Sequence, residues 1–473
     1  MNIGAPWPAR PEAIQRVLAM QTKLHRWAAA EPSRCFDDLF NLVYDPAFLA
    51  AAWYRVRGNK GRRTAGVDGV APSSIHNGAE FLAGLRGSLK ARRYTPTRVR
   101  EKSIPKGREK VRRLGIPTVA DRVVQASLTL VLEPIFEADF LPCSYGFRPS
   151  RRAQDAISEI RFLGSATANY QWVFEADIEA CFDNIDHSAL MGRVGRRVED
   201  KRILALVRSF LKAGVLGEDD KARATITGVP QGGILSPLLA NIALSTLDEH
   251  FAEKWQALGP TWHRAKLRRA GIPAMRIIRY ADDFVVMVNG QRADAEALWN
   301  EVTEVLEPIG LSLSPEKTRV CHIDEGFDFL GWRIQRRRWR GRTGRKVVYT
   351  YPSKKALTSV MAKVRSLTRR EKHRTLAELL RSVNRVLRGW CVYFRHGVSS
   401  RTFGYLDHFT WRRVFHWIWK RHATLGKRTL VHRHLPHWKI ADGREELFKP
   451  QSVRIIRYRY RGAQIPSPWA QSA

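Results

Sequence analysis

Acidic residues at the ends of apolar, strand-like runs are the residues of this sequence best suited to chemistry. The run Trp172–Ile178 carries Asp177 near its end, and a later segment places Ala281-Asp282-Asp283 between two short apolar runs. The second pattern is typical of a β-hairpin with acids at its tip. Carboxylates beside so many apolar residues are costly to bury unless they bind a cation. Two Mg²⁺ ions about 3.5–4 Å apart, clamping an attacking and a leaving oxygen, require such a set. An exposed Asp-Asp turn with an unrelated Asp177 is the alternative.

Between these acids lies a glycine-rich turn followed by an apolar helical pattern, GVPQGGILSPLLANIAL (residues 228–244). We expect its glycines to let the backbone approach a flat ligand closely. Ser236 is expected to be the N-cap of the following helix and Pro237 its first residue. A glycine-rich turn before a helix is a weak signal by itself, because an ordinary capped helix start has the same pattern.

The charge of the chain points to a polyanionic partner. Its 473 residues contain 81 Lys and Arg against 45 Asp and Glu, a net charge of +36, and its pI is about 10.7. A surface this basic attracts nucleic acid. The 44% of hydrophobic residues can build real cores, which excludes a disordered tail protein, and the length suggests two to four packed units.

Cysteine usage and hydropathy exclude other classes. Five scattered cysteines without any C-x-x-C pair argue against a disulfide framework and a zinc ribbon. No run of about 18 apolar residues is present, so we expect no membrane span. The first residues lack the apolar segment of a secretory signal, so we expect a cytoplasmic protein.

The order of patterns along the chain predicts an α+β protein. Helical pieces before residue 95 surround a basic, glycine-containing loop at Arg55–Gly69. Two strands joined by a turn follow at 98–117, then an apolar helix at 121–136. Strands and helices alternate from Trp172 to Trp332, and helical segments take over after Pro352. We place the main boundary between Arg333 and Lys354.

The helical end of the chain combines aromatic and basic residues. Aromatic residues at helical spacing in 379–422 are more often core than base-stacking platforms. The arginines there have few acids near them in sequence, which favours recognition of an RNA backbone. The tail 451–461 (QSVRIIRYRYR) alternates apolar and basic residues like an exposed strand and is expected to contact DNA.

Several motifs together resemble one family. Asp177 in a D-I-x-x-x-F-D context, PQGG at 230–233 and YADD at 280–283 resemble the active-site motifs of reverse transcriptases. The surrounding sequence resembles group II intron-encoded proteins in five segments: RRLGIPTVADRVVQ (112–125), SYGFRPSRRAQDAI (144–157), GGILSPLLANI (232–242), FLGW (329–332) and LRGWCVYFRHG (387–397). The chain is identified as a member of the group II intron-encoded reverse transcriptase and maturase family, over about residues 55–419. Endonuclease activity of the HNH type is not expected, because the paired cysteines of that domain are lacking.

The resemblance implies a set of active-site roles. Two Mg²⁺ ions would be held by Asp177, Asp282, Asp283 and the main-chain carbonyl of Ile178. Nucleotide contacts would come from Lys106, Lys110, Arg112, Phe182 and Gln231. Phe182 would stack under the sugar and clash with a ribose 2′-OH; core packing is its alternative. Lys317 would protonate the leaving pyrophosphate; a solvated lysine is its alternative. The family usually has proline where this chain has Arg113, so the local register of that strand is open.

The family also implies an architecture, a right-hand polymerase with fingers, a palm built on an antiparallel sheet and a helical thumb, followed by an α-helical maturase region. We divide the chain into an N-terminal extension with a basic RNA-binding loop (1–95), fingers and palm (96–340), thumb and maturase domain (341–430), and a short basic DNA-contacting element (431–473). RNA contacts are expected from Arg62, Arg63, Arg388, Arg412, Arg413, Lys420 and Arg421.

The function implied is an RNA-directed DNA polymerase, a nucleotidyltransferase, that is also the maturase of its own intron. Its expected partners are group II intron RNA, an RNA template with a DNA primer, target DNA for retrohoming, and dNTPs, and its expected location is the bacterial nucleoid. Two alternatives stay open: an RNA-binding splicing factor without polymerase activity, and a reverse transcriptase recruited to another pathway such as phage defence.

Overall fold

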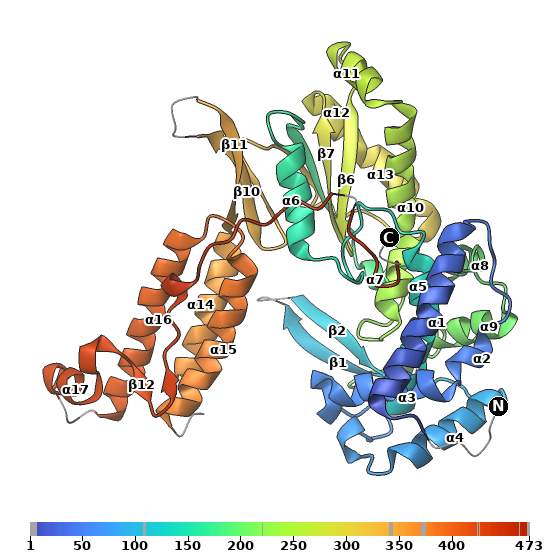
Figure 1. Ribbon diagram of the computed structural model, residues 1–473, viewed down its shortest axis with the longest axis horizontal. Helices are drawn as coiled ribbons and strands as arrows, with labels where there is room; N and C mark the ends of the chain where they lie inside the picture. Colours follow the sequence, from blue (N-terminus) through green and yellow to red (C-terminus); the bar gives the residue numbers. More distant parts are fainter. Residues whose placement is uncertain are drawn as a thin grey trace. The chain divides into compact units, whose positions relative to one another are not determined.

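The computed structural model describes residues 7–106, 110–219, 221–339, 344–369, 375–422, 424, 426–462 and 464–470 (Figure 1). Contacts divide the chain into two compact units. The first comprises Met1–Arg152, Phe174–Arg319 and Gly462–Ala473; the second comprises Ala153–Val173 and Val320–Arg461. Both units contain helices together with mainly antiparallel sheets, which confirms the α+β class. The units follow contacts and are discontinuous in sequence, whereas our division at residues 95, 340 and 430 follows function.

Helices build the N-terminal part of the first unit, and three of them, α1, α3 and α5, contact one another. The side chain of Asp45 caps α3 by accepting from the amides of Ala47 and Phe48, and the hydroxyl of Thr118 caps α5. The helical pieces expected before residue 95 and the helix expected at residues 121–136 are confirmed. The elements are α1 (Arg10–Ala30), α2 (Phe40–Val43), α3 (Pro46–Gly58), η1 (Lys60–Arg63), η2 (Pro72–Ser74), α4 (Gly78–Lys90) and α5 (Val119–Glu137).

Next comes a four-stranded sheet of order β2-β1-β4-β5. The strand–turn–strand pattern is confirmed, since β1 and β2 pair antiparallel from Arg100↔Ile116 to Lys106↔Lys110. β4 lies parallel to β1, and β5 antiparallel to β4. The strands are β1 (Val99–Lys106), β2 (Lys110–Ile116), β4 (Val215–Leu216) and β5 (Ala222–Arg223).

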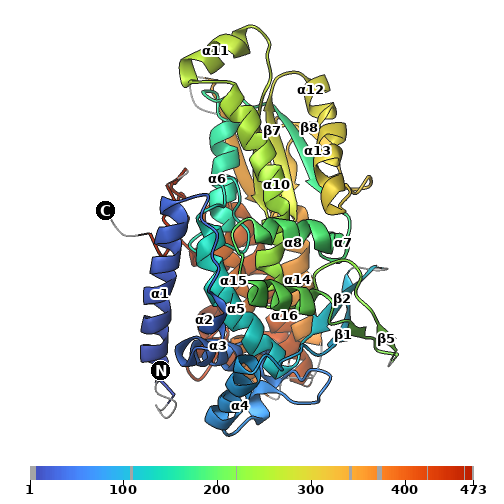
Figure 2. The ribbon, with the colours of Figure 1, turned by 90° about the vertical axis from the view of Figure 1, so that its right-hand side faces the viewer.

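A second four-stranded sheet, of order β6-β7-β3-β8, carries the predicted acids. The expected hairpin is formed by β6 and β7, and α10 contacts β6, α8 and α13 (Figure 2). The strands are β3 (Trp172–Asp177), β6 (Ala274–Tyr280), β7 (Asp283–Asn289) and β8 (Arg319–His322). The helices are α7 (Cys181–Asn184), α8 (His187–Gly195), α9 (Lys201–Leu211), α10 (Ser236–Ala257), α11 (Thr261–Arg269), α12 (Arg292–Glu296), α13 (Leu298–Leu306) and η3 (Glu307–Ile309).

The start of α10 differs from the prediction. Ser236 is already helical, Leu235 takes the cap position, and Pro237 is therefore the second helical residue. The Ser236 hydroxyl donates to the Pro230 carbonyl at 2.7 Å. The side chain thus closes the glycine-rich turn, and with Ser236 inside the helix it does not serve as the N-cap.

The second unit joins α6 (Ala153–Leu163) to a three-stranded antiparallel sheet and a helical cluster. The cluster core contains Val364, Leu379, Val383, Leu406 and Val414, with Trp417 buried and Trp411 and Phe415 packed against it, so these aromatic residues are core as expected. The elements are β9 (Phe327–Phe329), β10 (Trp332–Arg338), β11 (Lys346–Pro352), α14 (Lys354–Arg369), α15 (Leu376–Phe394), α16 (Ser400–Arg421), α17 (Lys427–His434), η4 (Pro436–Trp438), β12 (Ala441–Asp442), β13 (Glu445–Glu446) and η5 (Pro450–Ser452).

The tail after η5 is not the strand that its alternating sequence predicts. Residues 454–460 form no ladder with a neighbouring strand. The Ile456 amide donates to the Arg395 carbonyl at 3.0 Å, the Ile456 carbonyl is hydrogen-bonded to His396 Nδ1 at 3.0 Å, and side chains such as Tyr458 add further contacts. Across the described residues, no helix combines the length and apolarity that crossing a bilayer requires.

Candidate active site

Three aspartates lie at one edge of the β6-β7-β3-β8 sheet. Asp177 is the last residue of β3, Asp283 is the first residue of β7, and Asp282 precedes it in the turn after β6. Two of these aspartates act on the buried thiol of Cys181. Burial raises the pKa of this thiol, and the charges of Asp282 and Asp177 raise it further. The structure therefore brings together the acids that the sequence placed on two strand ends.

The turn that presents Asp282 has a strained backbone held by a close neighbour. Ala281 has a φ of 59°, in the left-handed region that disfavours residues with a Cβ. Gly146 lies so close that a Cβ there would be 2.3 Å from the Ala281 nitrogen. The Asn241 side-chain amide donates to the Gly146 carbonyl at 2.9 Å and fixes that approach. Glycine is required at 146 because backbone meets backbone there.

A fully buried guanidinium, that of Arg279, supports the same turn. It donates to Asp248 at 2.9 and 2.5 Å, and neither side chain has exposed surface. It also donates to the Ala281 carbonyl at 3.1 Å, to Asn241 Oδ1 at 2.9 Å and to Ser144 Oγ at 2.8 Å. Burial would lower the pKa of Arg279, but the charge and hydrogen bonds of Asp248, with smaller contributions from Cys143 and Cys181, together outweigh it, so the pKa is raised. Removing one partner of such a pair typically costs about 3–5 kcal/mol.

The segment before Gly146 adds a further strand-like edge to β6. The Tyr145 amide donates to the Arg279 carbonyl, and the Arg279 amide donates to the Cys143 carbonyl, both at 2.9 Å. Arg148 fastens this segment through a buried two-bond pair with Glu137, at 2.9 and 2.8 Å. The YGFRP motif thus acts as the brace of the Asp282–Asp283 turn.

Lys317 lies against the first of the aspartates, where its ammonium forms an ion pair with the Asp177 carboxylate. Within the described residues, no three His, Cys, Asp or Glu side chains form a ready metal cage. The ammonium shows nevertheless that Asp177 can balance a positive charge at this edge. Carboxylate oxygens are the ligands that Mg²⁺ prefers, so the donor set fits a divalent ion.

The carbonyl of Ile178 makes no hydrogen bond within the bridge that follows Asp177. Ile178 faces Leu313 in an isolated antiparallel bridge. The hydrogen bonds of that bridge join Glu179 to Ser312 and Ser314 to the carbonyl before Ile178. In such a non-hydrogen-bonded pair the central residue directs its own carbonyl away from the partner. The Ile178 carbonyl is thus available to a ligand on the other side.

A cavity of about 270 Å³ contains two of the five predicted nucleotide contacts, and none of the three aspartates lines it. Phe182 and Gln231 both line it, together with Asp183, which the sequence analysis did not single out. The Gln231 amide donates to Asp183 Oδ2 at 3.3 Å. The two residues are therefore placed where one small molecule could contact both.

The glycines of the turn approach protein backbone instead of a flat ligand. Gly228 has a φ of +86°, and a Cβ there would lie 2.5 Å from the Asp183 carbonyl oxygen. Gly232 has a φ of +112°, and its Cβ would lie 2.6 Å from the Gly115 carbonyl oxygen. The Gly115 amide donates to the Gln231 carbonyl at 2.7 Å. Our interpretation of these glycines is corrected: they dock β2 and the segment after Cys181 onto the turn.

The cation that lines this cavity is Arg113, the neighbour of the predicted Arg112. Successive strand residues point to opposite faces, and Arg112 does not line the cavity. Arg113 lies 3.8 Å from Glu101. Burial raises the pKa of Asp183, and the charges of Arg113 and, less, of Arg112 oppose that shift. Two further predicted side chains lie outside the described residues, those of Lys106 and Lys110.

Some residues of this site escaped the sequence analysis. Arg113 was not among the predicted contacts; the family usually has proline at this position, which left the local register of the strand open. Asp183 follows Asp177 by six residues and belongs to the quoted D-I-x-x-x-F-D pattern, so its signal was present. Arg279 and Asp248 could not be recognised in the sequence, because no sequence pattern links a basic residue inside a strand to an acidic residue on a helix.

The predicted RNA contacts in the basic loop are exposed on η1. Arg62 and Arg63 both face solvent. Arg122 fixes the loop from behind, because its guanidinium donates to the carbonyls of Thr64 at 2.8 Å and Gly61 at 3.4 Å. The loop is therefore a shaped basic surface.

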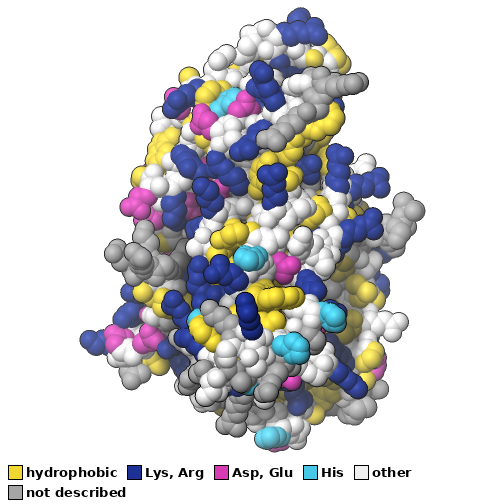
Figure 3. Space-filling view, turned by 90° about the vertical axis from the view of Figure 1, so that its left-hand side faces the viewer, with side chains coloured by type: hydrophobic (Ala, Val, Ile, Leu, Met, Phe, Trp, Pro, Cys, Tyr) yellow, Lys and Arg dark blue, Asp and Glu magenta, His cyan; other side chains and the backbone are white. Residues whose placement is uncertain are grey.

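The basic residues of the helical cluster differ in their surroundings. Arg412 and Lys420 are exposed and lie two turns apart on one face of α16. Arg413 is half-buried and donates to Thr368 Oγ1 at 3.2 and 3.0 Å. Arg421 lies over Trp417 at 4.3 Å, and Arg388 over Phe448 at 5.3 Å. Figure 3 shows Lys and Arg spread over one face of the molecule, with few Asp and Glu.

Comparison with known families matches two parts of the chain. Residues 104–334 match "Reverse transcriptase (RNA-dependent DNA polymerase)", and residues 357–435 match "Group II intron, maturase-specific domain". The three aspartates and the residues that line the cavity, except Val99 and Glu101, lie in the first match, and α16 lies in the second.

Individual relatives agree with this. Protein YkfC of Escherichia coli is 38% identical over 73% of this chain and 97% of its own length. The group II intron-encoded protein LtrA of Lactococcus lactis is 31% identical over 69% of this chain, which spans 61% of LtrA. Among solved structures, telomerase of Candida albicans aligns with a TM-score of 0.38 and 12% identity, over 72% of this chain and 64% of that chain; this likeness is too weak to argue from.

Replacing Gly146 by alanine tests the brace. The new Cβ would displace the Ala281 backbone, so primer extension should fall at least about tenfold, while binding of RNA, which rests on many cations, stays unchanged. Gly192→Ala is a matched control, because a Cβ there meets nothing within 4 Å. Equal extension rates for both variants would contradict the role of Gly146.

Proposed function

Since the chain belongs to the family of group II intron-encoded reverse transcriptases and maturases, we propose that it copies RNA into DNA and serves as the maturase of its own intron. The observation that carries the proposal is that Asp177 and Asp282 lie at one edge of the β6-β7-β3-β8 sheet, while Phe182, five residues after Asp177, lines a cavity together with Gln231. Its partners in this proposal are group II intron RNA, a primed template, dNTPs and, for retrohoming, target DNA, at the bacterial nucleoid.

Reverse transcriptases use divalent metal ions. In our proposal Asp177, Asp282, Asp283 and the Ile178 carbonyl hold two Mg²⁺ ions. When bound, they supply positive charge for the attacking primer hydroxyl and for the phosphate that is transferred.

The side chains around this centre have separate tasks. The ring of Phe182 lies under the sugar of the incoming nucleotide, and Gln231 contacts the nascent base pair. Arg113 and Arg112, with Lys106 and Lys110 on the same hairpin, hold the triphosphate. Lys317 must exchange its ion pair with Asp177 for a position beside the pyrophosphate, to which it gives a proton as that group leaves.

The maturase activity is assigned to the basic surfaces. Arg62 and Arg63 in the loop, and Arg412 and Lys420 on α16, are exposed and suited to phosphates. Arg388, Arg413 and Arg421 contact neighbouring side chains and contribute through the shape of that surface. We retain the division into 1–95, 96–340, 341–430 and 431–473 as a functional one.

Asp282→Asn and Asp283→Asn should each abolish primer extension on a poly-A template with an oligo-dT primer, because the amide cannot replace a charged metal ligand. Intron RNA affinity should stay within about twofold, since it is spread over many cations. Chelation of Mg²⁺ should stop the wild type in the same way. Extension by either variant near the wild-type rate would exclude the site, and leave a splicing factor without polymerase activity as the function.

Phe182→Ala should raise ribonucleotide incorporation, because the ring that clashes with a 2′-OH is gone. The ratio of deoxynucleotide to ribonucleotide incorporation is the measurement, with Trp262→Ala, an exposed aromatic residue of α11 that does not line the cavity, as the control. An unchanged ratio would mean that Phe182 is a packing residue only.

Replacing Arg412 and Lys420 together by glutamine should weaken intron binding and flatten its salt dependence by somewhat under about one unit of slope per lost phosphate contact. Arg413→Gln should do less, because its guanidinium is bonded to Thr368. Filter binding at two salt concentrations measures both. The charge-matched control is Arg10→Gln with Lys23→Gln, two exposed residues of α1. Equal losses in the control would show that only net charge matters.

A further inference from the structure

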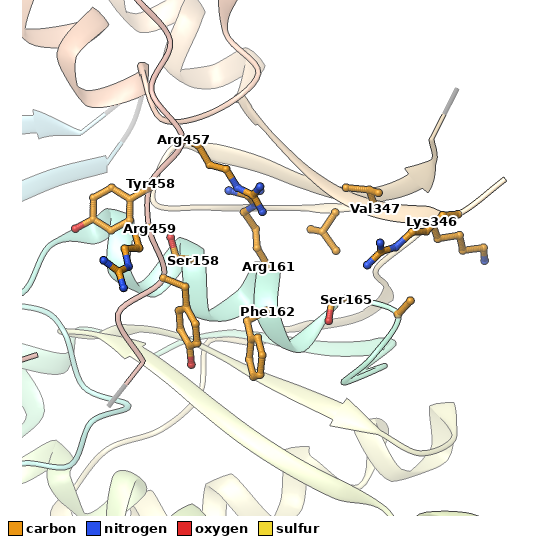
Figure 4. A pocket seen from close by; sticks show the side chains of 13 residues that line it. Ser158, Arg161, Phe162, Ser165, Lys346, Val347, Arg457, Tyr458 and Arg459 are labelled. Atoms are coloured by element: carbon orange, nitrogen blue, oxygen red, sulfur yellow. The ribbon is translucent and has the colours of Figure 1, made fainter. Parts of the chain in front are cut away.

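A cavity of about 480 Å³ lies within the second unit, between α6, β11 and the tail (Figure 4). A neighbouring cavity of about 770 Å³ shares five of its residues and continues it past Trp339 and His396. Volumes of this size are typical of ligand sites. Together they form a groove whose occupant nothing above explains.

Arginines from several elements line the first cavity, and a further lining cation, Lys346, is already paired with Asp324 at 2.7 Å. Arg161, from α6, and Arg457, from the tail, reach toward each other across it (Figure 4). Burial and the charge of Arg457 both lower the pKa of Arg161. In the described parts of the chain, no carboxylate forms an ion pair with either guanidinium. Two like charges held together in this way favour an anion between them.

The acids nearest this groove are already engaged. Asp155 accepts a two-bond pair from Arg461, at 2.9 and 2.6 Å, and a bond from the Tyr458 hydroxyl at 3.0 Å. Glu159 accepts from the Tyr460 hydroxyl. These bonds fasten the tail to α6 and leave its arginine at 457 directed into the cavity. The two arginines are therefore held in place before an anion binds, and Asp155 and Glu159 are already bonded to other side chains.

An aromatic platform adjoins the cations. Phe162 and Tyr460 stack with ring centroids 4.9 Å apart and planes 14° apart. Phe162 is still 49% exposed and Tyr460 37%. The bond to Glu159 holds the tyrosine in place. An exposed, fixed aromatic ring beside a phosphate site is the arrangement by which proteins bind unpaired bases.

We propose that this groove binds single-stranded nucleic acid, with one phosphodiester between Arg161 and Arg457 and an adjacent base on Phe162. A duplex is excluded from the aromatic part, because its bases are already stacked. The proposal rests in part on the proposed function, because Arg457 and Tyr460 belong to the C-terminal element that we expect to contact DNA, but no groove residue is one of the proposed catalytic or nucleotide contacts. RNA and DNA offer the same phosphodiester, so the experiment compares both.

The test uses the full chain and four labelled hexanucleotide probes: RNA and DNA of one sequence, an abasic DNA, and a short duplex. Affinities are measured by fluorescence anisotropy. Arg161→Gln with Arg457→Gln should weaken binding of the better single strand at least about fivefold and flatten its salt slope by about 0.7 for the lost contact. Phe162→Ala should weaken the base-containing strand by a similar factor and leave the abasic one unchanged. The stronger of the RNA and DNA signals identifies the natural strand.

Controls separate this site from general charge and from polymerisation. Lys355→Gln with Arg401→Gln removes the same charge from exposed positions outside the cavity and should change little. Thermal unfolding of each variant checks the fold. Primer extension on a short heteroduplex should persist in the groove variants, and Asp282→Asn should keep hexanucleotide binding, so the two proposals can fail separately. Equal losses in the charge control, or equal effects of Phe162→Ala on abasic and base-containing strands, would overturn the proposal.

Discussion

One buried ion pair, between Arg279 on β6 and Asp248 on α10, positions the rest of the active site. The guanidinium is fully enclosed, and its five N–H groups are directed to a carboxylate, an amide, a hydroxyl and the carbonyl of Ala281. An unpaired charge in such a place would be strongly destabilising, so helix and hairpin have one relative position that satisfies both ions. That position presents Asp282 and Asp283 beside Asp177.

Close backbone contacts transmit this constraint. Gly146 lets the YGFRP segment touch the Ala281 turn, while Gly228 and Gly232 let the PQGG turn touch the chain after Cys181 and the end of β2. Each contact joins segments far apart in sequence without a side chain between them. The Phe182–Gln231 cavity is therefore framed by rigid backbone, which suits a site that must discriminate between sugars by shape.

Much of the site was predictable because strand-end acids and hairpin turns leave local patterns. The hairpin of β6 and β7 and the strand ending at Asp177 follow from residues close in sequence, whereas Phe182 and Gln231 were expected near the nucleotide only from the family resemblance. The choice between Arg112 and Arg113 could not be predicted from the sequence. Both residues are exposed, and only the register of β2 decides which of them faces the cavity. The pairs Arg279–Asp248 and Arg161–Arg457 were also missed. Each pair forms through a tertiary contact, and the sequence does not show which residue a given arginine will contact.

The most direct test of this account is the Mg²⁺ dependence of primer extension in Arg279→Lys. Lysine keeps the charge beside Asp248 but cannot reach the Ala281 carbonyl and Ser144 as well, so the turn loses its support. We expect cooperative unfolding and intron binding to persist, while extension falls at least about tenfold and requires more Mg²⁺. A variant that folds and extends primers at the wild-type rate, with the wild-type Mg²⁺ requirement, would contradict the claim that Arg279 positions the catalytic turn.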